Sequence, residues 1–286
     1  MQQKVSFQDL NPLTLLERSA FVYPGKTAVV YGSRRYTYHQ FSDRVKRLAG
    51  ALKRVGVEKG DRVAFLAPNG PPMLEGHYGP LYIGAVLVAL NYRLSSREIA
   101  YIINHCGAKV LVFDSELAPI VRELKDDVPA VTTFVQVVDV APKAEDIPGP
   151  DYESFLASAP EGVHRVELDS ELETIAIDYT SGTTGQPKGV EYNARGAYLA
   201  AISEALEAVM SWRSVYLWTL PMFHCNGWCF TWSVTAVGAT HVCLRRVEPE
   251  EIYRLIRQEG VTHMCCAPTA LTSMYSSPAA EGQDLS

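Results

Sequence analysis

Apolar residues along this chain alternate between two spacings. From residue 41 to residue 55 they recur every three or four positions, after a capping-box pattern at 37–40 and before Gly56, which predicts one amphipathic helix. Short continuous apolar runs follow at 62–67 and 85–90, and such runs are typical of buried strands. Amphipathic helices that alternate with short apolar strands predict an α/β fold with a parallel sheet.

The same patterns extend over the rest of the chain. Further strands are predicted at 27–31 and 35–37, as a hairpin, and at 109–113, 131–138, 174–179, 190–192, 215–220, 240–244 and 262–266. Further helices are predicted at 13–20, 73–83, 95–105, 117–124, 195–210 and 248–260, and from residue 268 onward, with a helix or buried segment at 228–237. The helix at 195–210 carries four large apolar residues on one face, Leu199, Ile202, Leu206 and Val209.

A polar segment divides these elements into two groups. Residues 141–170 are rich in Pro, Asp, Glu and Ser, and we expect them to form a solvated connection. The sequence therefore predicts a first α/β subdomain at 1–140, an acidic, Pro-rich connection at 141–170, and a second α/β subdomain at 171–286.

Composition narrows the classes of function. The 286 residues are 47% hydrophobic and 20% charged, as in globular proteins that bury a sizeable core. A net charge of −6 argues against nucleic acid as the main partner, because clustered Lys and Arg bind the phosphate backbone. No apolar run approaches the roughly 20 residues of a transmembrane helix, and the N-terminus lacks an apolar signal core.

Cysteine usage bears on the compartment and on metal binding. Six cysteines without a signal peptide favour reduced thiols inside the cell. We expect a cytoplasmic or peroxisomal protein with no visible targeting signal, since the C-terminus does not read Ser-Lys-Leu. His224, Cys225 and Cys229 superficially suggest metal ligands, but structural zinc sites pair two close-spaced doublets and no second one is present. We predict no metal site made by this chain.

The densest chemistry lies in residues 180–189, which read Thr-Ser-Gly-Thr-Thr-Gly-Gln-Pro-Lys-Gly between two predicted strands. Glycines let backbone N–H groups turn toward one point, hydroxyls add donors there, and Lys188 adds a positive charge. This combination predicts a concave site for a polyphosphate. The alternative is a flexible surface turn, because Gly and Ser clusters usually mark loops. A plain turn rarely packs three glycines, four hydroxyls and a Lys between two apolar strands.

The loop differs from a Walker A loop, which reads G-x-x-x-x-G-K-[ST] and opens a helix. Here Pro187 precedes Lys188 and a strand follows. "YTSGTTGQPKGV" instead resembles, position by position, the phosphate loop of the AMP-forming adenylating enzymes, which include acyl-CoA synthetases, aryl-CoA ligases and luciferases. "LAGALKRVGVEKGDRVAF", "LWTLPMFHCNGW" and "GVTHMCCAPTAL" are similar to other segments of that superfamily. "PMFHCNGWCFTW" resembles most the short- and medium-chain acyl-CoA synthetases, including fungal secondary-metabolism ligases.

The resemblance implies a reaction and a set of site residues. A small carboxylic acid or fatty acid reacts with ATP and Mg²⁺ to give an acyl-adenylate and pyrophosphate, and the thiol of CoA then takes the acyl group. The β- and γ-phosphates would be held by Thr180, Ser181, Gly182, Thr183, Thr184, Gly185 and Lys188. His224 would be the catalytic histidine beside the carboxylate and α-phosphate, and Gly227 and Trp228 would line the acyl pocket. The alternatives are a hydrogen-bonded core histidine and ordinary core packing.

Two departures from the family pattern affect these expectations. Asn193-Ala194-Arg195-Gly196 has Ala where family members commonly carry His. The adenine-contacting segment, the Tyr-Gly-x-Thr-Glu and Thr-Gly-Asp motifs, the hinge and the mobile C-terminal lid are absent from the 286 residues. The fold expected is thus the N-terminal part of a multi-layer adenylate-forming α/β domain, with an incomplete second subdomain.

The function expected is an AMP-dependent acyl-CoA ligase that is incomplete as this chain and has little or no activity alone. The alternative is a catalytically inactive remnant, or a split-enzyme subunit that needs a complementing C-terminal fragment. A phosphate-binding α/β module of an unrelated kind is a third interpretation.

Overall fold

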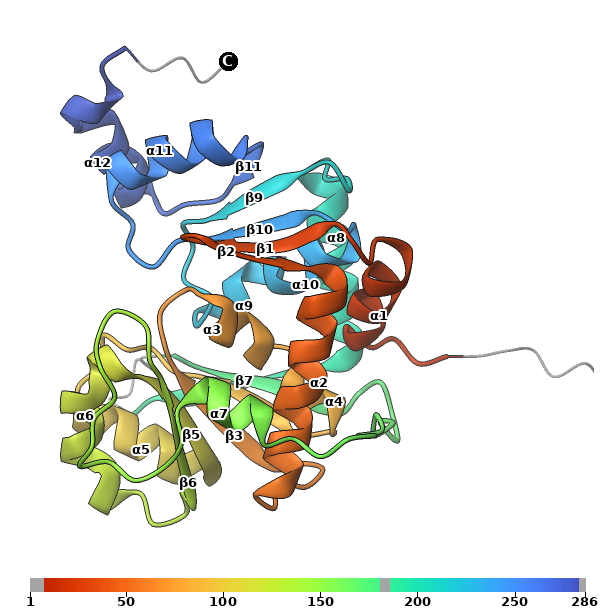
Figure 1. Cartoon of the computed structure of the whole chain (residues 1–286), viewed down its shortest axis with the longest axis vertical. Coiled ribbons are helices and arrows are strands. Elements are labelled where there is room, and N and C mark those ends of the chain that lie inside the picture. Colours follow the sequence, from red (N-terminus) through yellow and green to blue (C-terminus); the bar gives the residue numbers. More distant parts are fainter. Residues whose placement is uncertain (1–7, 181–185, 283–286) are drawn as a thin grey trace, which may run out of the picture.

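The computed structural model describes residues 8–180 and 186–282. Within these ranges the strands form two sheets (Figure 1). The first sheet has the order β6 (Thr133–Val137), β5 (Ala108–Asp114), β3 (Arg62–Leu66), β4 (Val86–Ala89), β7 (Thr174–Thr180) and β8 (Lys188–Asn193). The second sheet has the order β11 (His263–Met264), β9 (Val215–Trp218), β10 (Thr240–Cys243), β1 (Thr27–Tyr31) and β2 (Arg34–Thr37). Neighbouring strands are parallel except in the hairpins β1–β2 and β7–β8, which confirms the predicted α/β class.

Helices cover both sheets and fill the space between them. They are α1 (Leu13–Val22), α2 (Tyr38–Arg54), α3 (Pro71–Gly76), α4 (Gly79–Tyr82), α5 (Ser96–Cys106), α6 (Ala118–Leu124), α7 (Tyr152–Ala157), α8 (Ala194–Glu207), α9 (Cys225–Trp228), α10 (Phe230–Ala236), α11 (Pro249–Glu259) and α12 (Pro268–Ser276). Short 3₁₀ turns are η1 (Ser115–Leu117), η2 (Lys125–Asp127) and η3 (Pro278–Ala280). Helices α5 and α6 cover the outer face of the first sheet, and α11 and α12 cover the outer face of the second (Figure 1).

Successive side chains of a strand point to opposite faces of its sheet, so they pack alternately in the central core between the sheets and beneath the outer helices. In β3, Val63 and Phe65 join the central core between the sheets, while Ala64 and Leu66 pack beneath α5 and α6. In the second sheet, Trp218 of β9 belongs to the central core and Leu217 to the outer one. Strands that are apolar on both faces explain the continuous hydrophobic runs in the sequence.

Each sheet draws strands from both sides of the 141–170 segment. The hairpin β1–β2 pairs with β10 through Val29 and Val30, and β7 pairs with β4 through Ala176 and Ile177. The boundaries 1–140 and 171–286 therefore do not coincide with the two sheets, and the division into subdomains stays a prediction.

The segment 141–170 is packed rather than solvated along part of its length. Tyr152, Phe155 and Leu156 of α7 are buried in the central core, and Ile147 is buried beneath α6. Charged residues of the segment lie between these buried residues and face outward. The composition of the segment, which is rich in such residues, therefore suggested a solvated connection.

Two helices differ from the sequence expectation. The predicted helix at 73–83 is interrupted between α3 and α4, because Pro80 has no N–H for a helical hydrogen bond. Helix α8 buries Ala194, Ala197, Ala201 and Ala205, and its exposed side carries Leu199 and Leu206. Small side chains let α8 pack closely on α10, so the alanine face rather than the leucine face meets the core.

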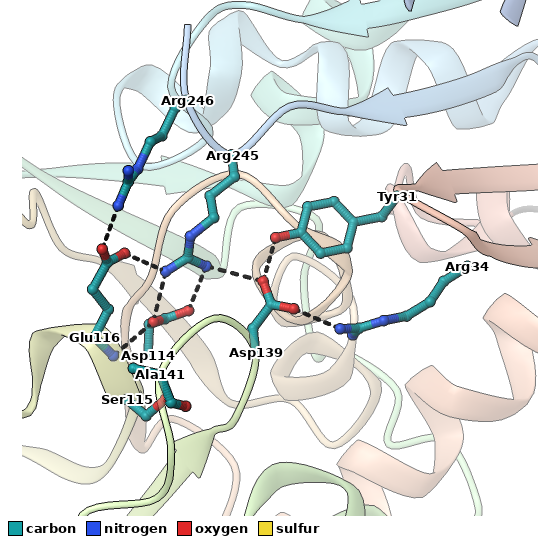
Figure 2. A network of polar contacts seen from close by, with 9 residues as sticks. All are labelled: Tyr31, Arg34, Asp114, Ser115, Glu116, Asp139, Ala141, Arg245 and Arg246. Carbon is teal, nitrogen blue, oxygen red and sulfur yellow. Dashed lines mark hydrogen bonds and ion pairs between the residues drawn. The ribbon is translucent and has the colours of Figure 1, made fainter. Parts of the chain in front are cut away.

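An ionic cluster with a largely buried centre joins the two sheets (Figure 2). Arg245, just beyond β10, donates from Nη1 and Nη2 to the two carboxylate oxygens of Asp114 at the end of β5, each at 2.8 Å. The same guanidinium contacts Asp139 at 3.2 Å and Glu116 at 2.6 Å. Asp139 also accepts hydrogen bonds from Tyr31 and Arg34 of the second sheet.

The ionic cluster keeps the Arg245 side chain charged. Burial by itself lowers the pKa of Arg245, but the hydrogen bonds to Asp114 and Glu116 outweigh it and raise that pKa overall. Only 12% of the Arg245 side chain and 2% of the Asp114 side chain are exposed, so this contact is an interior ion pair.

Candidate functional site

The phosphate-loop sequence bridges the two strands of the β7–β8 hairpin. Thr180 ends β7 and pairs directly with Lys188, which begins β8, and both residues are exposed. Lys188 makes no ion pair with another described residue, so its ammonium group is available to an anion. The other predicted phosphate ligands, Ser181, Gly182, Thr183, Thr184 and Gly185, lie outside the described residues, and their role stays a prediction.

A cavity of about 520 Å³ lies between the end of β7 and the start of α5. Thr180, Gln186 and His224 line it on one side, and Arg97 and Tyr101 line it on the other. The structure thus brings two of the predicted site residues, Thr180 and His224, to one cavity. Lys188, Gly227 and Trp228 are not among the residues that line it.

Arg97 and Tyr101 were not predicted as site residues. Both occupy polar positions of an ordinary amphipathic helix, α5, whose capping box at Ser95 was the only local signal. Nothing in their spacing distinguishes them from solvent-facing residues.

His224 precedes a turn with left-handed backbone. The five residues from Cys225 to Cys229 have positive φ angles between 49° and 61°. For residues other than Gly this conformation costs about 1–2 kcal/mol each. Such strain persists only where surrounding contacts over-determine it, and it clusters at functional sites. The turn places the side chains of His224 and Trp228 at the surface, with 57% of Trp228 exposed.

Gly227 is required by its surroundings as well as by its φ of +61°. A Cβ atom at this position would lie 2.4 Å from Cζ3 of Trp218 and 2.9 Å from Cη2. The Trp218 ring is itself fixed, because it stacks on His241 and its Nε1 donates to His241 Nδ1 at 3.1 Å. The space beside Gly227 is therefore filled by this ring, and the proposed acyl-pocket role of Gly227 and Trp228 stays a prediction.

Asp178 lies at the base of the phosphate hairpin and is almost fully buried. Its Oδ2 accepts a hydrogen bond from Nδ2 of Asn226 at 2.9 Å. Burial raises the pKa of the Asp178 carboxyl to about 7, against the opposing effect of the hydrogen bonds from Asn226 and Tyr192. Neither Asp178 nor Asn226 was among the site residues predicted from the sequence.

The raised pKa of Asp178 makes stability depend on pH. Between pH 4 and pH 7 the folded protein holds a proton on this group that the unfolded chain has lost, so the stability it provides declines as pH rises through that window. Each unit of difference between the two pKa values corresponds to about 1.4 kcal/mol. We expect Asp178→Asn to flatten this slope, measured as urea unfolding free energy against pH for both proteins. Parallel profiles for wild type and variant would contradict the assignment.

Comparisons with known proteins bear on the family and the fold of this chain. The family described as AMP-binding enzyme matches residues 16–286. A 4-hydroxybutyrate–CoA ligase of Metallosphaera sedula is 44% identical over 269 residues, which are 93% of this chain and 49% of the relative. A butyrate–CoA ligase of Arabidopsis thaliana, described as peroxisomal, is 41% identical over 91% of this chain and 47% of its own length. The chain spans about half the length of the curated relatives it matches.

Solved structures show the same fold. The N-terminal domain of FACL13 from Mycobacterium tuberculosis, solved with an inhibitor, superposes with a TM-score of 0.85 at 30% identity and covers 95% of this chain and 66% of that chain. An anthranilate CoA ligase with bound anthranoyl-AMP gives a TM-score of 0.88 at 23% identity over 98% of this chain and 54% of its own. The fold thus matches about two thirds of the FACL13 N-terminal domain and about half of the anthranilate CoA ligase.

Two further observations concern the described ranges only. Across 8–180 and 186–282, no helix combines the length and apolarity needed to cross a bilayer. Within the same ranges, no three His, Cys, Asp or Glu side chains gather into a group that could hold a metal ion.

Proposed function

Because this chain belongs to the AMP-binding enzyme family, we propose that it forms the phosphate-binding and acyl-binding part of an AMP-forming acyl-CoA ligase. The observation that carries the proposal is the cavity shared by Thr180 and His224, beside a hairpin whose Lys188 has no anionic partner among the described residues. A site with hydroxyl, imidazole and ammonium groups suits a polyphosphate that meets a carboxylate.

The reaction follows from these groups. A carboxylate oxygen of the acid attacks the α-phosphorus of ATP, the bond to the bridging oxygen breaks, and pyrophosphate leaves. The CoA thiolate then attacks the acyl carbon, and AMP leaves with the oxygen. Lys188 and the hairpin would neutralise the leaving pyrophosphate, and His224 would donate a hydrogen bond near the reacting carboxylate. Mg²⁺ would accompany ATP and offset phosphate charge, and we assign no described residue to it.

The acid we propose is a short-chain monocarboxylic acid. The relatives described above act on butyrate and 4-hydroxybutyrate, according to their names. The exposed indole of Trp228, on the strained turn after His224, offers an apolar surface for such a chain. A cytoplasmic or peroxisomal location stays a prediction.

Turnover by the 286 residues alone is not expected, because the adenosine-binding motifs and the lid of the family are not among them. Pyrophosphate release from ATP with butyrate or 4-hydroxybutyrate separates the alternatives. Release by the isolated chain that disappears in Lys188→Ala would overturn the inactive-remnant alternative. Release that requires an added polypeptide carrying the C-terminal half of such a ligase would favour a split enzyme.

Phosphate binding can be tested without turnover. We expect Lys188→Ala to weaken the affinity for magnesium pyrophosphate by about tenfold or more, because a charge-assisted hydrogen bond contributes about 1.5–3 kcal/mol. Isothermal titration calorimetry measures this affinity. The matched control is Lys46→Ala, which removes an exposed lysine from α2, away from the hairpin. Equal affinities in the two variants would rule out Lys188 as a phosphate ligand.

A further inference from the structure

The loop after β3 reaches the segment that leads to His224. Asn69 lies in this loop and is 6% exposed. Its Nδ2 donates to the carbonyl oxygens of Trp218 at 3.0 Å and Leu220 at 2.7 Å, and its Oδ1 accepts from the Met222 N–H at 2.8 Å. One side chain from the loop after β3 thus binds three backbone groups at the end of β9 and just beyond it.

The hydrogen bonds from Asn69 to Leu220 and Met222 satisfy backbone groups that have no partner in a helix or a strand. Residues 219–222 follow the end of β9 and have no strand partner for their backbone, and Met222 is fully buried. A buried backbone donor or acceptor without a partner destabilises the folded protein. Asn69 supplies both kinds of partner, because its amide carries two donors and an acceptor in one plane.

The far side of the His224 turn is tied to the phosphate hairpin. Asn226 is fully buried and donates to Asp178, which lies on β7 just before Tyr179 and Thr180. His224 is therefore flanked in sequence by one anchor to the loop after β3 and one to β7. Strands β3 and β7 both pair with β4, in parallel.

We propose that Asn69 is a positioning residue that, with the Asp178–Asn226 bond, holds the left-handed turn so that His224 faces the cavity beside the phosphate hairpin. The importance of that placement for catalysis rests on the function proposed above. The placement itself does not rest on that function, because left-handed backbone is strained at the residues of the turn other than Gly and needs contacts from outside the turn to persist.

The test is native-state hydrogen exchange with NMR of the His224 imidazole, on the isolated chain. In Asn69→Ala we expect the Met222 amide to exchange at least tenfold faster, while the amide of Val112 in β5 keeps its protection. We also expect the His224 ring resonances to shift. Asn104→Ala is the matched control, because the Asn104 side-chain amide makes a single exposed hydrogen bond, to the Asp127 carbonyl at 2.8 Å. In this control neither the Met222 exchange rate nor the His224 resonances should change.

If Asn69→Ala does not fold, a second pair of variants tests whether outside contacts hold the His224 turn. Asp178→Ala should shift the His224 resonances, and Asp178→Asn should restore them, because its amide accepts from Asn226 Nδ2 and can donate to Asn226 Oδ1, which has no partner in the described ranges. Uniform loss of protection, or faster exchange of Met222 with unchanged His224 resonances, would overturn the proposal. Neither readout depends on ligase activity, so failure of the proposed function would show separately in the Lys188 titration.

Discussion

Gly227→Ala is expected to lower the free energy of unfolding by about 2–4 kcal/mol, a large fraction of the stability of a domain. Two costs add. The new Cβ would meet the Trp218 ring at 2.4 Å, and that ring cannot retreat without losing its stacking and its hydrogen bond to His241. The φ of +61° also places Ala in a left-handed conformation. Urea or thermal unfolding, followed by tryptophan fluorescence, measures the loss.

Gly32→Ala separates the two costs. Gly32 has a φ of +56°, close to that of Gly227, but a Cβ there would meet nothing within 4 Å. This control should therefore lose only about 1 kcal/mol, from backbone strain alone. If the two variants lose the same stability, the clash with Trp218 is not the cause.

Arg245→Met is expected to destabilise the protein by about 3–5 kcal/mol, the cost of removing one partner from a buried ion pair. The methionine fills much of the arginine volume, so the loss reports charge rather than a cavity. It leaves the carboxylate of Asp114 buried without its bidentate partner, and Asp139 loses one of its three donors (Figure 2). Equilibrium unfolding in urea at pH 7 measures the effect.

Arg122→Met is the matched control for that change. Arg122 also makes a bidentate pair, with Asp146, but both side chains are about half exposed. Exposed ion pairs contribute little to stability, so no measurable change is expected. An equal loss in both variants would show that burial is not what makes the Arg245 cluster important.

Local patterns predicted much of the fold because the interactions behind them are local. The capping box at Thr37 is formed as the sequence indicated, a second one forms at Ser95, and each begins a helix whose apolar stripe faces the core. The hairpin around the phosphate loop has the predicted strands on both sides. The motif in that hairpin also led to the family to which the chain belongs.

Part of the candidate site was also visible in the sequence. Thr180 and Lys188 were predicted from the phosphate-loop motif and His224 from the family resemblance, and Thr180 and His224 line one cavity. Asn69 and Asn226 were missed, since a lone Asn in a Pro-Asn-Gly turn, or beside a Gly, is typical of ordinary loops. Their partners are 149 to 153 and 48 positions away along the chain, and no local pattern records contacts at such separations.

The sequence by itself determined the approximate positions of most helices and strands, the α/β class and the family, because capping, periodicity and motif chemistry act within a few residues. Only the tertiary structure decided which sheet each strand joins, which face of α8 is buried, and how the His224 turn adopts a left-handed backbone. Those outcomes depend on close packing between distant segments, such as the alanines of α8 on α10 and the Trp218 ring on Gly227. The phosphate-loop motif thus has its chemistry in the sequence, but it is the fold that brings Thr180, at the end of β7, to the same cavity as His224.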